Sequence, residues 1–117
     1  MGRNVLFFAW NRSIPGREKL SSAHFQEFVQ YLVAQKQNGS IDSFEPVFLD
    51  THGGDLNGFV LVRADTAKLD ALAASDEWLT HIVRAAMHLE GSGSVRGVTG
   101  EAVMERMALW TKHIPAT

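Results

Sequence analysis

Cysteine is absent from this chain of 117 residues. Disulfides, thiolate zinc sites and cysteine nucleophiles are therefore excluded, and a chain without cysteine fits a cytoplasmic location. Long hydrophobic runs are also absent, since the longest, Val5 to Trp10, is far shorter than the roughly 20 residues of a membrane-spanning helix. The N-terminus lacks the basic start, apolar region and small-residue cleavage site of a secretion signal. We expect no membrane partner.

An excess of one charge is missing as well. Lysine and arginine number 11 against 13 acidic residues, and the basic residues are scattered among the acids. A nucleic-acid interface needs clustered basic side chains, so we expect no nucleic-acid partner. The length and the hydrophobic share of 45% predict one globular domain over residues 1–117.

Two segments are apolar without alternation. Val5 to Trp10 contains no charge and no helix breaker, and Phe59 to Val62 has the same character. A strand with one buried face alternates apolar and polar residues, whereas an unbroken apolar strand is buried on both faces. We expect these two segments to be the central strands of a sheet.

A helix is predicted after the loop Asn11 to Leu20. Ser21 or Ser22 can cap its N-terminus, His24 falls on its polar side, and Gly39 ends it by adopting positive φ. Its buried stripe has helical spacing and consists of Phe25, Phe28, Val29, Leu32 and Val33.

The second half of the chain predicts further elements. Ile41 to Thr51 is a strand at the edge of the sheet or one with a bulge, because Pro46 cannot donate a hydrogen bond. Asp65 or Thr66 caps a helical region, and Ser75 caps a second one after a short break. A short strand, Val95 to Thr99, and a helix, Glu101 to His113, complete the chain.

This order predicts an α+β fold: a ferredoxin-like βαββαβ unit with a four-stranded antiparallel sheet and an extra C-terminal helix. Both helical regions of that unit cover one face of the sheet. The other face would expose large apolar side chains, each worth about 1.5 to 3 kcal/mol when buried. A second copy packed sheet to sheet is the simplest cover, which predicts a homodimer. The alternative cover is the C-terminal helix folded back onto the sheet.

With this element order the chain resembles the dimeric α/β-barrel superfamily, which includes antibiotic-biosynthesis-type and haem-degrading monooxygenases and stress-responsive barrel proteins. Two stretches sharpen the likeness to the haem-degrading members: Phe8 to Arg12, and Ser75-Asp76 followed by an apolar helix. Of the functional positions of those members, Asn11 matches. Leu72 replaces a tryptophan, and Ile82 replaces a histidine, with His81 one residue away.

Several side chains are candidates for a site. The candidate catalytic residues are Asn11, Trp10 and His81. Trp10 and Asn11 end the first strand, where they would line the mouth of a barrel cavity. Arg63 and Arg96 lie on strands with much apolar surface, where a guanidinium group needs a partner. That partner is a carboxylate such as Glu45 or Asp50, an acidic ligand, or water at the end of a strand. The predicted ligand-binding residues are Trp10, Asn11, Arg63 and Arg96.

No metal site and no cofactor are predicted. His81 and His88 are two helical turns apart, about 10 Å along the axis, which is too far to chelate one ion. His52 and Asp55 lack further ligands in the sequence. The glycines from Gly91 to Gly97 have neither the spacing nor the strand-to-helix context of a phosphate loop.

Two functions are consistent with these features. The first is a homodimer that binds a small apolar or aromatic molecule in a cavity between facing sheets. The resemblance implies a cofactor-independent monooxygenase for this case, in which the pocket excludes water and stabilises a substrate anion. The second is a non-catalytic stress-responsive or regulatory dimer with a packed barrel interior.

Overall fold

The unbroken apolar segment at the start of the chain forms a central strand. A computed structural model describes residues 2–116. Its elements, in order, are β1 (Val5–Trp10), β2 (Arg12–Ser13), α1 (Glu18–Gln37), β3 (Ser43–Phe48), β4 (Gly58–Arg63), α2 (Thr66–Ala73), α3 (Asp76–Ala86), β5 (Leu89–Glu90), β6 (Gly93–Gly97) and α4 (Glu101–Lys112).

The main sheet has four strands in the order β3-β4-β1-β6, and all its neighbours are antiparallel. β1 and β4 are central, as their lack of alternation predicts. Phe8 of β1 pairs with Val60 of β4 on one side and with Ser94 of β6 on the other. β3, which contains Pro46, lies at the edge, as predicted from the missing N–H group.

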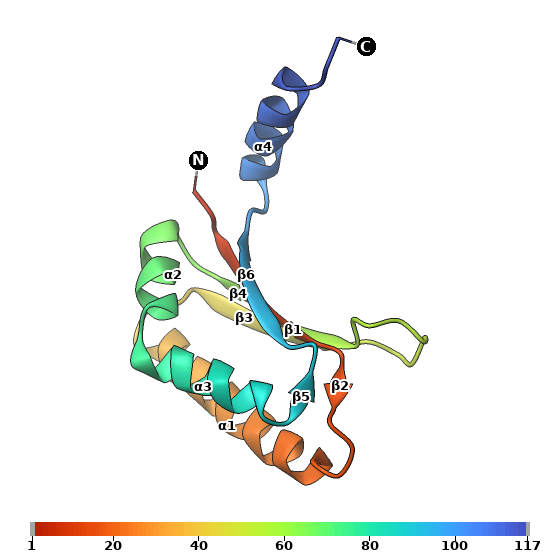
Figure 1. Cartoon of the computed structure of the whole chain (residues 1–117). Helices are drawn as coiled ribbons and strands as arrows, with labels where there is room; N and C mark the ends of the chain where they lie inside the picture. Colours follow the sequence, from red (N-terminus) through yellow and green to blue (C-terminus); the bar gives the residue numbers. More distant parts are fainter. Residues whose placement is uncertain (1, 117) are drawn as a thin grey trace.

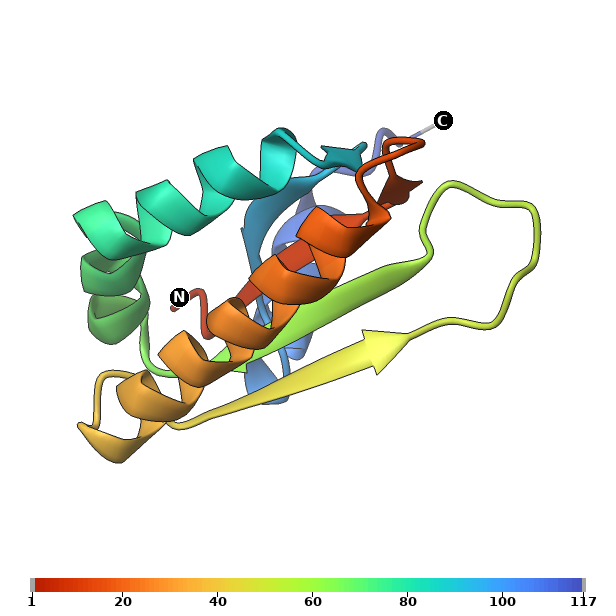
Figure 2. The ribbon, with the colours of Figure 1, turned by 90° about the horizontal axis from the view of Figure 1, so that it is seen from below.

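The helices α1, α2 and α3 all cover one face of this sheet (Figures 1 and 2). The core lies between the two layers. Its strand residues alternate along β1 and β4 and are buried to the same side: Leu6, Phe8, Val60 and Val62. The helices contribute Phe28 and Leu32 from α1, Leu69 and Leu72 from α2, and Trp78 from α3. The predicted ferredoxin-like α+β fold is confirmed.

The break between α2 and α3 lies where the sequence predicts it. The Asp65 side chain accepts a hydrogen bond from the Lys68 N–H and so caps α2. The Ser75 hydroxyl oxygen accepts one from the Trp78 N–H at 3.3 Å and caps α3. These caps satisfy N–H groups that have no partner within their own helix.

The start of α1 differs from the prediction. The helix begins at Glu18 with Arg17 at the N-cap, and no side chain caps it. The segment expected to be a loop also contains β2, which pairs with β5. Ser21 is not a cap because its hydroxyl group lies against His88, a residue far along the chain.

The C-terminal helix does not fold back onto the sheet. α4 projects from the end of β6, away from the rest of the chain (Figure 1). None of its residues is buried, and Met104 and Trp110 are each 70% exposed. The alternative cover for the second face is therefore wrong for the single chain, whose sheet is open on that side and does not close into a barrel.

Candidate functional site

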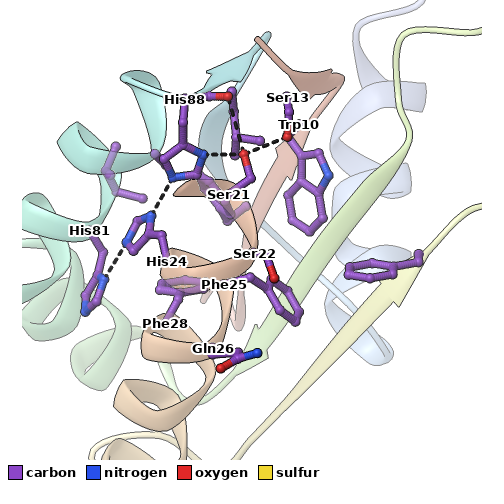
Figure 3. Close-up of a pocket in the computed structure, with 15 residues that line it drawn as sticks. Trp10, Ser13, Ser21, Ser22, His24, Phe25, Gln26, Phe28, His81 and His88 are labelled. Atoms are coloured by element: carbon purple, nitrogen blue, oxygen red, sulfur yellow. Dashed lines mark hydrogen bonds between the residues drawn. The ribbon is translucent and has the colours of Figure 1, made fainter. Parts of the chain in front are cut away.

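A pocket of about 340 Å³ lies on the helix-covered side of the sheet. It is bounded by the end of β1, the first half of α1 and the second half of α3 with the residues that follow it (Figure 3). The sequence predicted a cavity between the facing sheets of two copies. That cavity would belong to an assembly and stays a prediction, whereas the pocket found here lies within one chain.

One wall of the pocket is aromatic. Alternation along β1 directs Phe8 and Trp10 toward the helices, where they meet rings from α1 and β3. The Trp10 ring centroid is 6.2 Å from that of Phe25 and 6.0 Å from that of Phe48, both in edge-on geometry. Gly58 lies beneath Trp10, since a Cβ atom at this position would overlap the indole ring. The absence of a side chain at Gly58 lets the Trp10 ring approach β4 closely.

The opposite wall carries a line of hydrogen-bonded side chains, which we call the polar chain: Ser21, His88, His24 and His81 (Figure 3). Ser21 Oγ lies 2.7 Å from His88 Nδ1. His88 Nε2 lies 2.8 Å from His24 Nδ1, and His24 Nε2 lies 3.0 Å from His81 Nδ1. The Ser13 hydroxyl group extends the line by donating to Ser21 Oγ at 2.6 Å.

The packing of α3 against α1 explains how the polar chain forms. His81 lies within α3 and His88 just beyond its end, so about two helical turns separate them. The His24 ring occupies the space between them and is bonded at both of its nitrogens. His81 and His88 are too far apart to chelate one ion, and the imidazole of His24 bridges the distance between them.

Burial keeps these imidazoles uncharged. His24 is only 5% exposed, and desolvation, followed by the positive charge of Arg84, lowers its pKa to about 4. Desolvation and then Arg84 also lower the pKa values of His81 and His88. At neutral pH each ring therefore has one N–H donor and one bare nitrogen acceptor. Either direction of hydrogen bonding satisfies all three rings at once.

The pocket offers polar groups without formal charge. Besides the polar chain and Ser13, the hydroxyl group of Ser22 and the amide of Gln26 line it. Among the described residues that line this pocket there is no lysine, arginine, aspartate or glutamate. The arrangement suits a molecule with an apolar aromatic body and one hydrogen-bonding group.

A metal ion does not fit the histidine cluster. His24 uses both ring nitrogens to contact neighbouring imidazoles, which leaves neither free to ligate an ion in this arrangement. Across residues 2–116, no group of three or more histidine, aspartate or glutamate side chains is arranged to hold a metal.

The predicted site residues do not gather in one place. Trp10 and His81 line the pocket. Asn11 does not, because its Oδ1 accepts a hydrogen bond from Asn57 Nδ2 at 2.7 Å. The two arginines lie elsewhere.

Each arginine has a protein partner. Arg63 pairs with Glu45, one of the carboxylates that the sequence suggested, at 3.4 Å. Arg96 pairs with Asp70 of α2, and it also donates to the Arg3 carbonyl oxygen at 2.7 Å. Both guanidinium groups are therefore engaged outside the pocket, and Arg96 Nε is buried without a hydrogen-bond partner.

Sequence reasoning missed three of the four members of the polar chain: Ser21, His24 and His88. The prediction that His24 lies on the polar side of its helix is wrong, since it is buried. A signal was present, because His24, Phe28 and Leu32 are spaced by four residues and share one helix face. The hydrophobic pattern alone groups a histidine with the polar residues, whereas hydrogen bonds to His81 in α3 and to His88 just after it allow His24 to be buried.

Comparison with known proteins supports the fold. No family model matches the chain, and no curated protein matches it. Among solved structures, a dimeric protein of unknown function with a ferredoxin-like fold from Bacteroides fragilis is similar, with a TM-score of 0.56 and 16% sequence identity. The match covers 81% of this chain and 95% of the other. Within residues 2–116, no helix has both the length and the apolar character needed to span a bilayer.

Proposed function

We propose that this protein is a homodimer that binds a small aromatic molecule carrying one polar group in the pocket between β1, α1 and α3. The observation that carries this proposal is the lining itself: an aromatic wall faces the polar chain, and no formally charged side chain is among the described lining residues. The volume of about 340 Å³ is within the range of small-molecule sites.

The two walls divide the recognition between them. Trp10, Phe25 and Phe48 offer ring edges and faces to a planar ligand, and such aromatic pairs contribute roughly 0.5 to 1.5 kcal/mol each beyond area burial. The polar chain offers hydrogen bonds to one substituent. A charged group held against the aromatic wall would be desolvated there without a partner, which is costly.

Ligand-observed NMR with a set of small aromatic compounds tests the proposal. Trp10→Leu should weaken binding of any hit at least tenfold, because the indole forms part of the aromatic wall. Trp110→Leu is the matched control, since Trp110 is exposed on α4 outside the pocket. Equal affinities for the two variants would contradict the proposed site.

The homodimer is supported by apolar surface that the single chain leaves uncovered. The open face of the sheet carries Phe7, Phe59 and Leu61, and α4 exposes Met104 and Trp110. The radius of gyration is 16.1 Å, whereas a compact chain of this length would have about 13.4 Å. A second copy would cover the open face of the sheet and the exposed side chains of α4. The structurally similar protein from Bacteroides fragilis is described as dimeric.

In the catalytic form of this proposal, the protein belongs to the dimeric α/β-barrel superfamily. It then acts on the bound molecule as a cofactor-independent monooxygenase. The largely apolar lining of the pocket supports it, because such chemistry requires a substrate anion shielded from water. A non-catalytic stress-responsive or regulatory dimer is the alternative. It predicts that bound ligands leave unchanged when oxygen is present.

A further inference from the structure

We propose that the polar chain removes the proton of a phenolic or enolic hydroxyl group on a molecule bound in the pocket and passes that proton to solvent. This inference rests on the proposed function, because it requires a ligand in the pocket. It adds the chemical class of that ligand and a role for the buried histidines.

The geometry provides a continuous path. Successive polar atoms from Ser21 to His81 are separated by 2.7, 2.8 and 3.0 Å, each within hydrogen-bond distance. All four side chains line the pocket, with Ser21 at one end of the path beside Ser13 and His81 at the other. His81, at the other end, is half-buried and so reaches water, whereas His24 in the middle is buried.

The transfer conserves protons at every step. The O–H bond of the ligand breaks as its proton passes to Ser21 Oγ, while the original hydroxyl proton of Ser21 passes to His88 Nδ1. His88 gives its Nε2 proton to His24 Nδ1, and His24 gives its Nε2 proton to His81 Nδ1. The Nε2 proton of His81 leaves to water. The ligand is then an anion, and each imidazole is neutral in the opposite tautomer.

The local electrostatics favour this path over storage of the charge. Because burial lowers the pKa values of all three histidines, none retains an added proton at neutral pH. At that exit, Arg84 acts most strongly among the charges and opposes positive charge on His81, and Glu27, which pairs with Arg84, and Glu77 partly offset it. A proton therefore passes along the polar chain, and none of its histidines keeps it.

The pocket end suits the anion that remains. Ser21 lies in the first turns of α1, whose N-terminal end carries a partial positive charge. The Ser13 hydroxyl group lies beside it, and no carboxylate is among the described lining residues to oppose the anion. Phenols and enols are acidic enough to ionise under these conditions, whereas simple alcohols are not.

Two probes test this inference, 4-nitrophenol and its methyl ether 4-nitroanisole, which has no acidic proton. The acid dissociation constant of 4-nitrophenol bound at saturation, followed by its phenolate absorbance, should be at least tenfold larger than that of the free probe. Nitrogen-15 NMR should then show His88, His24 and His81 switching together from the Nε2–H to the Nδ1–H tautomer. 4-Nitroanisole should bind without this switch.

Variants separate a relay from a merely structural cluster. In His24→Phe, the Nε2 proton of His88 has no acceptor, so bound 4-nitrophenol should no longer switch the tautomer of His88 or of His81. His52→Gln is the control, because His52 lies in the exposed loop between β3 and β4 and outside the pocket. It should behave as the original chain does. His81→Gln, altered only at the half-buried end, should abolish the tautomer switch of His24 if His24→Phe does not fold.

The outcomes distinguish the two proposals. Binding of 4-nitroanisole together with an unshifted 4-nitrophenol titration would overturn the relay and leave the aromatic pocket in place. Ionisation of bound 4-nitrophenol with unchanged histidine tautomers would also overturn the relay. If neither probe binds, the proposed function itself fails, and the relay fails with it.

Discussion

At the scale of single residues, the buried histidines make stability depend on pH. The folded-state pKa of His24 is about 4, whereas an unfolded histidine has a pKa near 6.5. Between these values the unfolded chain binds more protons than the folded chain. The free energy of unfolding is therefore at its full value above about pH 6.5 and falls as the pH drops toward 4, by about 3 kcal/mol for His24. Urea unfolding at several pH values measures this.

The variant His24→Phe isolates that contribution. It should be less stable at neutral pH, because His81 and His88 each lose a hydrogen-bond partner. Its stability should nevertheless fall less steeply between pH 6.5 and 4. The exposed His52 serves as the control, and His52→Gln should retain the original slope. Parallel pH profiles for His24→Phe and the original chain would rule out His24 as the source.

At the scale of elements, the junction between α2 and α3 depends on one hydroxyl group. Ser75 Oγ accepts a hydrogen bond from the Trp78 N–H and donates one to the Leu72 carbonyl oxygen at 2.7 Å. Ser75→Ala should lower the free energy of unfolding by about 1 kcal/mol, or the melting temperature by roughly 4 °C. Ser75→Thr keeps the hydroxyl group and should lose less. Calorimetry showing equal losses would exclude the cap as the cause.

At the scale of the whole molecule, the open face of the sheet decides the assembly. Leu61 lies on that face in the central strand β4 and is only half-buried in the single chain. Leu61→Lys places a charge in the proposed sheet-to-sheet interface and should convert a dimer into a monomer in sedimentation experiments. Leu79→Lys, on the outward side of α3 where Leu79 is 57% exposed, is the matched control and should remain dimeric.

Two results would contradict this arrangement. A monomeric original chain would mean that the open face and α4 need no second copy. A dimeric Leu61→Lys variant together with a monomeric Leu79→Lys variant would move the interface from the sheet to α3.

Local physics determined much of the fold from the sequence. The unbroken apolar segments Val5 to Trp10 and Phe59 to Val62 predicted central strands, and both are central, while the second face of the sheet is left open in the single chain. Pro46 could not donate a ladder hydrogen bond, so its strand lies at the edge. Asp65 and Ser75 cap helices because their side-chain oxygens reach backbone N–H groups three residues later.

Tertiary structure alone decided the candidate site. His24 is buried because α3 brings His81 and His88 to both of its nitrogens, and Ser21 is drawn from a cap position to His88. These contacts join residues 57 to 67 positions apart. Periodicity assigns each side chain to a face of its own element, but it does not specify which polar groups meet when two helices pack. The sequence therefore determined the layers, and helix packing determined the polar chain within them.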